Sequence, residues 1–159
     1  MLKGKTVVLG ITGGIAAYKA VDLASKLTQL GAKVETIMTE SAMKFITPVT
    51  LRGVTGQNVA TTMWDLSGPF SVEHVALADA ADVVVIAPAT ANTIAKIANG
   101  LADDLLSCTV LATKAPVVIA PAMHNNMWEN PVTQENIKKL KARGFTIVGP
   151  GYGRLASGG

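Results

Sequence analysis

The side chains best able to do chemistry lie in a few short segments of this sequence. Residues 121–128, Pro-Ala-Met-His-Asn-Asn-Met-Trp, place three adjacent hydrogen-bonding side chains, beginning at His124, among two methionines and a tryptophan. Core packing explains the apolar residues of this segment but not the three polar ones, which are typical of a loop that binds a small molecule. For His74, the only other histidine, the residues alone favour a structural role.

A glycine-rich turn follows the first apolar run, in the segment 10–15, Gly-Ile-Thr-Gly-Gly-Ile. Backbone amides can approach an anion closely at glycines, so the segment is interpreted as a phosphate cradle or, alternatively, as a tight turn without a ligand. The dinucleotide fingerprint would need glycine where Thr12 and Ile15 stand, and no Walker lysine is present. The next apolar run ends in the hydroxyl of Thr39 rather than in an acid, which favours a mononucleotide over NAD.

The segment 87–93, Ala-Pro-Ala-Thr-Ala-Asn-Thr, combines small side chains with hydrogen-bonding ones. A flat ring or a phosphate could lie against such a backbone while Thr90, Asn92 and Thr93 supply hydrogen bonds. The alternative for Asn92 or Thr93 is a plain helix N-cap. Cys108 lies in an apolar helical stretch with no histidine near it in the sequence, which favours a core residue over a nucleophile.

Short apolar runs alternate with helical periods along the whole chain. Strands are expected at residues 6–9, 33–38, 82–87, 116–120 and 145–148, and helices at residues 15–30, 92–99, 103–112 and 131–143. This alternation predicts a three-layer α/β fold with a doubly wound parallel sheet, of the flavodoxin or Rossmann type. Ligands bind such sheets at the carboxyl ends of the strands, so the loops to consider are 10–15, 39–43, 88–93 and 121–128.

The composition restricts the classes of protein further. The chain has 159 residues, of which 49% are hydrophobic and 16% charged, with a net charge of +3. Such a chain is too apolar to be disordered, and its apolar runs are far shorter than the roughly 20 residues of a membrane span. The basic cluster at residues 138–143 favours a solvated helix face over a nucleic-acid patch. The two histidines lack partners at ligand spacing, so no metal site is expected.

Two further expectations concern the environment of the chain. The single cysteine excludes an internal disulfide and fits a reducing, cytoplasmic compartment, and no export segment is visible. The low fraction of charged residues predicts that surface is covered by other copies of the chain in a homo-oligomer.

Taken together, residues 13–19, His74, residues 87–93 and residues 121–128 resemble the homo-oligomeric flavoprotein cysteine decarboxylases. The resemblance covers nearly the whole chain and is greatest to the members that act on 4'-phospho-N-pantothenoyl-L-cysteine in coenzyme A biosynthesis. It implies a single domain over residues 1–159 that binds FMN, in trimers or dodecamers, with a phosphopantothenate-cysteine ligase domain or partner as a further expectation. Other enzymes of the superfamily (peptidyl-cysteine decarboxylases, flavin prenyltransferases) and a non-catalytic flavin-binding subunit are the alternatives.

The resemblance also implies roles for individual residues. His74 would be the catalytic base or orienting group, and Ser157 would stand at the position of a proton donor. The substrate would contact Ala122, His124, Asn125 and Met127. FMN would be bound by Gly13, Gly14, Ile15, Thr39, Ser41, Ala89, Thr90, Asn92, Thr93 and Ser107.

In the family mechanism, FMN takes two electrons from the substrate's cysteine, the resulting thioaldehyde loses carbon dioxide, and the electrons then return. This chain departs from the family pattern at two positions. His124 replaces an asparagine that holds the substrate carboxylate, and an imidazole can still donate to that group. Ser157 replaces a proton-donating cysteine, and a hydroxyl is far less acidic than a thiol, so slower reprotonation is expected.

Overall fold

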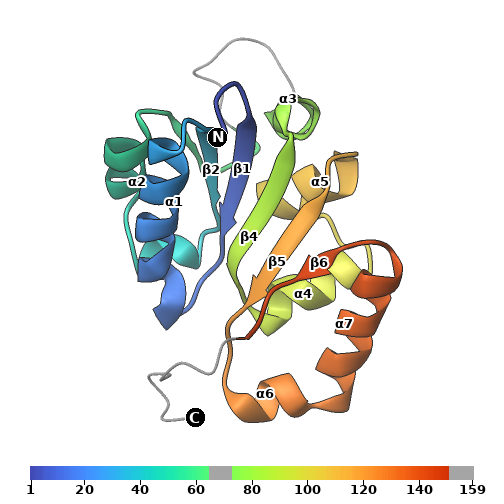
Figure 1. Ribbon diagram of the computed structural model, residues 1–159. Coiled ribbons are helices and arrows are strands. Elements are labelled where there is room, and N and C mark those ends of the chain that lie inside the picture. Colours follow the sequence, from blue (N-terminus) through green and yellow to red (C-terminus); the bar gives the residue numbers. More distant parts are fainter. Residues whose placement is uncertain (65–72, 151–159) are drawn as a thin grey trace.

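The computed structural model describes residues 1–64 and 73–150. Within these residues, six parallel strands form one sheet in the order β3-β2-β1-β4-β5-β6 (Figure 1). The strands are β1 Thr6–Ile11, β2 Lys33–Met38, β3 Val59–Ala60, β4 Val83–Ala89, β5 Val117–Pro121 and β6 Thr146–Ile147.

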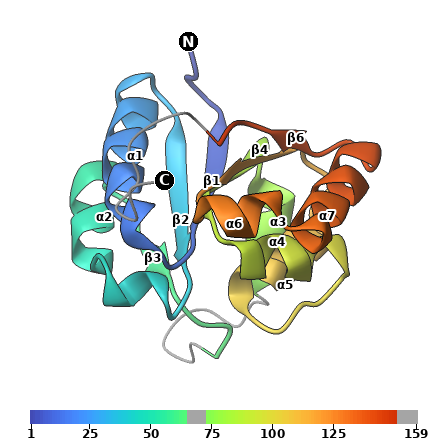
Figure 2. The ribbon, with the colours of Figure 1, turned by 90° about the horizontal axis from the view of Figure 1, so that it is seen from below.

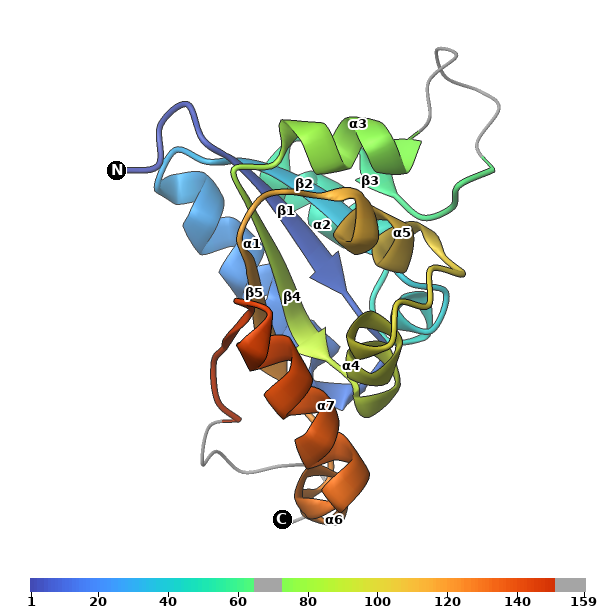
Figure 3. The same ribbon diagram turned by 90° about the vertical axis from the view of Figure 1, so that its right-hand side faces the viewer.

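Helices connect the strands and cover both faces of the sheet. They are α1 Lys19–Gln29, α2 Pro48–Thr55, α3 Glu73–Ala80, α4 Ala91–Ala98, α5 Leu105–Ala112, α6 Asn125–Glu129 and α7 Pro131–Ala142, with short 3-10 turns η1 Ile15–Tyr18 and η2 Ala42–Lys44. Figures 2 and 3 show α1 and α2 on one side of the strands and α3, α4, α5 and α7 on the other.

The central strands are apolar on both sides because both sides are covered. In β1, Leu9 packs with α1 and α2, whereas its neighbour Val8 packs with the helices of the opposite layer, and both are fully buried. Continuous apolar strands of this kind are typical of parallel sheets between two helical layers. The predicted three-layer, doubly wound α/β fold is therefore confirmed, with the Rossmann strand order rather than the flavodoxin order.

Several predicted elements have the expected bounds, and others differ for local reasons. The strand predicted at residues 33–38 is β2 to the residue, whereas β4 continues two residues past its predicted end at Ala87. The helix predicted at residues 15–30 begins as the tight turn η1, and no side chain caps its start. A 3-10 turn satisfies some of the backbone groups that such an uncapped start leaves unpaired.

Residues 44–81, to which the sequence patterns assigned nothing, contain α2, β3 and α3. The ends of α2 are marked by Pro48 in its first turn and by Gly56, which adopts the left-handed conformation (φ 71°). These are the usual start and stop residues of a helix, so the signal was present in the sequence. In contrast, the two residues of β3 are too few to show a strand period.

The basic cluster of α7 is partly engaged rather than simply solvated. Arg143 Nη1 donates a hydrogen bond to the carbonyl oxygen of Ala98 at 2.8 Å, and Lys139 Nζ donates to Asn99 Oδ1 at 3.0 Å. Both cations thus lie at the C-terminal end of α4, where they complement the helix dipole. This contact fixes α4, whose other end enters the site described below. None of the described helices combines the length and the apolar character that a membrane span requires.

Candidate functional site

The site lies where the chain reverses direction across the sheet, at the carboxyl ends of β1 and β4. From β1 the chain order runs outward to β2 and β3, and from β4 it runs the other way to β5 and β6. The loops after two such strands diverge and leave a crevice, which is the usual ligand site of a doubly wound sheet. Backbone hydrogen bonds join these loops: Thr12 N–H donates to Pro88 O at 3.3 Å, and Ala122 N–H donates to Ala89 O at 3.0 Å.

The glycine turn after β1 passes directly against the turn after β2. A Cβ atom added to Gly13 would overlap the Cβ of Ser41 and lie 3.0 Å from its carbonyl carbon. Only glycine permits this approach, which places backbone amides beside the exposed Ser41 side chain. The Thr39 side chain stabilises the turn after β2, because its Oγ1 accepts a hydrogen bond from Ala42 N–H at 3.1 Å. The close approach accounts for glycine at this position, and the binding of an anion here stays a prediction.

A cavity of about 540 Å³, which we call the hydroxyl cavity, opens on one side of this turn. Most of its polar wall consists of threonine and serine side chains. The lining residues are Thr12, Gly13, Thr39, Glu40, Ser41, Thr61, Thr62, Met63, Trp64, Thr90, Asn92, Thr93, Lys96, Asp103, Asp104 and Leu105. The segment 61–64 was not expected here, although two adjacent threonines after an apolar pair could have indicated a strand end.

Three of the four charged residues that line the hydroxyl cavity, Lys96, Asp103 and Asp104, pair with one another, and Glu40 is the fourth. Lys96 Nζ lies 2.9 Å from Asp103 Oδ1 and 3.6 Å from Asp104 Oδ2. The hydrogen bond from Lys96 lowers the pKa of the Asp103 carboxyl, and the same bond raises the pKa of the Lys96 ammonium, against the opposing effect of burial. The ammonium is thus already neutralised by two carboxylates, so a phosphate in this cavity would depend on amides and hydroxyls instead.

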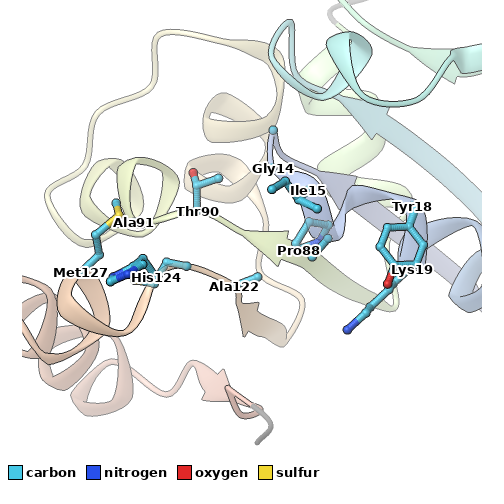
Figure 4. Close-up of a pocket in the computed structure, with 13 residues that line it drawn as sticks. Gly14, Ile15, Tyr18, Lys19, Pro88, Thr90, Ala91, Ala122, His124 and Met127 are labelled. Atoms are coloured by element: carbon cyan, nitrogen blue, oxygen red, sulfur yellow. The ribbon is translucent and has the colours of Figure 1, made fainter. Parts of the chain in front are cut away.

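A second cavity of about 340 Å³, which we call the apolar cavity, opens on the other side of the turn. Figure 4 shows His124 and Met127 on one side of it and Tyr18 and Lys19 on the opposite side, with Pro88 and Ala122 between them. Two residues, Gly13 and Thr90, line both cavities and form their boundary. The apolar cavity is lined by Gly13, Gly14, Ile15, Ala16, Tyr18, Lys19, Pro88, Thr90, Ala91, Ala122, Met123, His124 and Met127.

The orientation of the His124 ring is set by a hydrogen bond at the start of α6. Its Nδ1 accepts from Asn126 N–H at 3.1 Å, which makes His124 the N-cap of this helix. An imidazole that accepts at Nδ1 carries its proton on Nε2, so Nε2 is left as a donor. Asn125 is the first residue of α6, is exposed, and does not belong to the cavity lining. Of the four predicted substrate residues, Ala122, His124 and Met127 line the cavity, and Met123 of the same segment joins them.

The N-cap of α4 is Thr90, not Asn92 or Thr93. Thr90 Oγ1 accepts from Thr93 N–H at 3.2 Å and donates to Thr93 Oγ1 at 3.1 Å. A side chain of this segment does cap the helix, as the alternative predicted, but the capping residue is Thr90. The reason is that α4 begins at Ala91, one residue earlier than predicted. Asn92 remains exposed on the wall of the hydroxyl cavity.

Two predicted cofactor residues lie behind the lining. Ala89 is fully buried in the core. Ser107 is 4% exposed and forms a capping box with Asp104, in which Ser107 N–H donates to Asp104 Oδ1 at 2.8 Å and Asp104 N–H donates to Ser107 Oγ at 3.1 Å. Their contact with a cofactor stays a prediction, while the structure gives both a role in packing or capping.

His74, one of the two predicted catalytic residues, belongs to neither cavity lining. His74 is the second residue of α3 and is half-buried. Thr113, just after α5, donates to Ala78 O near the end of α3, so these packed helices end together. The first turns of α3 and α5 therefore face the same edge of the sheet, the edge of the hydroxyl cavity. Ser157 lies outside the described residues.

Cys108 is half-buried rather than a fully buried core residue. Its Sγ donates to Ala102 O at 3.2 Å, and burial together with Asp104 and Asp103 raises the pKa of the thiol. A raised pKa opposes a role as a nucleophile. Among residues 1–64 and 73–150, no three His, Cys, Asp or Glu side chains lie together as a metal site would require.

The residues around the glycine turn fit the FMN that the resemblance implies. The cradle between Gly13 and Ser41 would be filled by a side chain on Gly13, and hydroxyl and amide side chains line the cavity beside it together with four charged ones. Mononucleotide phosphates are bound by such amides and hydroxyls, and hydroxyls along a wall suit a polyhydroxylated chain. With about 540 Å³, the cavity is within the usual range for cofactor sites.

Comparison with known proteins gives matches over nearly the whole chain. The Flavoprotein family matches residues 1–158. The coenzyme A biosynthesis bifunctional protein CoaBC of Vibrio vulnificus (strain YJ016) is 48% identical over 157 residues, which are 99% of this chain and 39% of that protein. The chain thus spans about two fifths of the length of such relatives.

Solved structures give a similar result. The FMN-dependent cysteine decarboxylase SpaF has a TM-score of 0.87 and 38% identity, over 93% of this chain and 85% of that chain. A mutant PPC decarboxylase complexed with pantothenoylaminoethenethiol has a TM-score of 0.84 and 37% identity, over 97% of this chain and 86% of that chain.

Proposed function

The chain belongs to the Flavoprotein family, and from this premise we propose that it is an FMN-dependent carboxy-lyase acting on 4'-phospho-N-pantothenoyl-L-cysteine. The product would be 4'-phosphopantetheine, a step of coenzyme A biosynthesis. The observation that carries the proposal is the pair of cavities that meet at Gly13 and Thr90. One suits a phosphorylated cofactor and the other an elongated substrate, and a redox cofactor must lie against the bond that it oxidises.

The hydroxyl cavity would hold FMN. The backbone amide of Gly13 and the hydroxyl of Ser41 would bind its phosphate, and Thr90 and Asn92 would face the rest of the molecule. Two further predicted cofactor residues, Gly14 and Ile15, line the apolar cavity, where they would meet the edge of the cofactor that faces the substrate. When bound, FMN supplies a two-electron acceptor and donor, which makes the cysteine carboxylate of the substrate easy to lose. The protein's own contribution is position and proton transfer.

The apolar cavity would orient the substrate through charges at its two sides. The substrate is an anion at both ends, with a carboxylate beside its thiol and a phosphate at the far end. His124 and Lys19 lie on opposite sides of the cavity (Figure 4), so the Nε2 donor of His124 can bind the carboxylate and the Lys19 ammonium the phosphate. Ala122 and Met127 supply apolar walls that exclude water from the reacting end.

Proton transfer is assigned to two residues. His74, at the first turn of α3, would take or orient the proton that leaves the substrate as it is oxidised. Ser157 would supply a proton to the carbon that has lost carbon dioxide, more slowly than a cysteine would.

The experiment that tests this function uses wild-type protein and His74→Asn. Purified wild type should show the absorbance of oxidised flavin and release carbon dioxide from the substrate, with 4'-phosphopantetheine as the product by mass spectrometry. The His74→Asn variant should keep the flavin spectrum and lose the release of carbon dioxide. Flavin binding without carbon dioxide from this substrate would reject the proposal. Decarboxylation of a peptide ending in cysteine instead would assign the peptidyl-cysteine reaction.

We further propose that the chain acts as a homo-oligomer, a trimer or dodecamer, in the cytoplasm. Three apolar side chains that line the apolar cavity are strongly exposed, namely Ile15 (62%), Tyr18 (60%) and Met127 (49%), which supports coverage by another copy. The single, half-buried thiol of Cys108 fits a reducing compartment. The bifunctional relatives support a ligase domain or partner, which would form the substrate of this enzyme in the preceding step. Loss of activity on dilution, with loss of the oligomer in light scattering, would support the assembly.

A further inference from the structure

A buried hydroxyl lies between the two cavities, at the point where β1 and β4 part. The pairing of these strands ends at Gly10 and Ile86, and the chains then diverge toward the two cavity-lining turns. Thr12 stands just past this end and is 1% exposed. Its side chain takes over where the strand ladder stops: Oγ1 donates to Pro88 O at 2.7 Å and accepts from Thr90 N–H at 3.0 Å.

These two bonds hold together the parts that both cavities share. Thr12 precedes Gly13, and its hydroxyl reaches the backbone on both sides of Ala89, so it links the glycine turn to the start of α4. Thr90 in turn caps α4 through Thr93. Since Gly13 and Thr90 are the two residues that line both cavities, their separation depends on this hydroxyl together with the bond from Thr12 N–H to Pro88 O.

The segment held by Thr12 also carries the third loop of the site. Ala89 O accepts from Ala122 N–H at 3.0 Å, so the loop after β5 is attached to the same backbone. A displacement of residues 88–90 would therefore be passed to Ala122, on the wall of the apolar cavity.

We propose that Thr12 is a positioning residue for the FMN site, a role that rests on the proposed function. Without the Thr12 hydroxyl, Thr90 N–H would lose its hydrogen-bond acceptor, and Pro88 O would lose one of the two donors that Thr12 supplies. Leaving such groups unpaired away from water costs free energy. The turn and the helix start would then separate or admit water, and the cradle would no longer be preformed. Serine preserves the hydroxyl, whereas valine preserves only the shape.

The chain offers a closely matched control in Thr55, near the end of α2. Its Oγ1 also donates to a backbone carbonyl, that of Leu51 at 2.8 Å, and also accepts from a backbone N–H, that of Gln57 at 3.2 Å. Thr55 is 7% exposed and lines neither cavity. The Thr55→Val variant thus loses the same two bonds away from the site.

The experiment compares the FMN dissociation constants of wild type, Thr12→Val, Thr12→Ser and Thr55→Val, measured by flavin fluorescence at a temperature where all four are folded by circular dichroism. We expect Thr12→Val to weaken FMN binding by about tenfold, with Thr12→Ser within about threefold and Thr55→Val within about twofold of wild type. Should Thr12→Val fail to fold, Thr12→Ala takes its place with the same expectation.

Wild-type affinity in Thr12→Val, or an equal loss in Thr55→Val, would overturn the positioning role. Either result would leave the proposed function intact as long as wild type binds FMN and releases carbon dioxide. Failure of the wild type to bind FMN would instead reject the proposed function, and the positioning role with it.

Discussion

Replacement of Gly13 by alanine tests the cradle most directly, because the structure shows what a side chain would meet. The new Cβ would overlap Ser41 Cβ and lie 3.0 Å from the carbonyl carbon and 3.2 Å from the carbonyl oxygen of Ser41. Two of these atoms are backbone, so a rotamer change of Ser41 cannot relieve the contact and one turn must move. Overpacking of this kind costs about 1–3 kcal/mol.

That cost converts into an expected loss of affinity. If it falls on the arrangement that binds FMN, the dissociation constant should rise about 5- to 140-fold, since each 1.4 kcal/mol is a factor of ten. The assay is titration of FMN into apoprotein, with Gly53→Ala as the control. Gly53 lies in α2 with open space around it, so alanine should leave FMN binding unchanged and stabilise the helix by up to about 1 kcal/mol. Gly13→Ala protein with both the affinity and the melting temperature of wild type would refute the close approach.

Further predictions concern the paired charges, the thiol and the two departures from the family pattern. The Asp103 carboxyl, whose pKa Lys96 lowers from 3.8, stabilises the fold fully above about pH 5, and this stabilisation is lost as the pH falls through the lowered pKa. Lys96→Met should remove that part of the acid dependence of the unfolding free energy; an unchanged dependence would contradict it. Because burial raises its pKa, Cys108 should react with iodoacetamide more slowly than free cysteine at pH 8 and equally fast in urea. His124→Ala should raise the KM for substrate roughly tenfold, whereas His124→Asn, which keeps a cap and a donor, should not; equal effects would argue against the contact. Ser157→Cys should increase 4'-phosphopantetheine formed per carbon dioxide released, and an unchanged ratio would exclude Ser157 from the protonation step.

The loops that form the site were predictable because strand ends are visible in the sequence. Apolar runs such as residues 33–38 end at recognisable turns, and parallel strands bring the turns after them to one edge. The glycine turn and residues 121–128 were thereby placed together correctly. The wall at residues 61–64 was missed, because β3 is too short for its period to appear.

The sequence by itself determined the fold class, the family resemblance and the identity of the loops, because periodicity and residue type are local properties. Only the tertiary structure decided which hydroxyls are free to meet a ligand. The sequence does not distinguish the hydroxyls of three predicted cofactor residues, but the structure does. Thr90 caps α4 on the boundary of the two cavities, Thr39 caps a turn, and Ser107 is buried in a capping box. Hydrogen-bond partners come from segments distant in the chain, as with Thr12 and Pro88, and no local pattern records them.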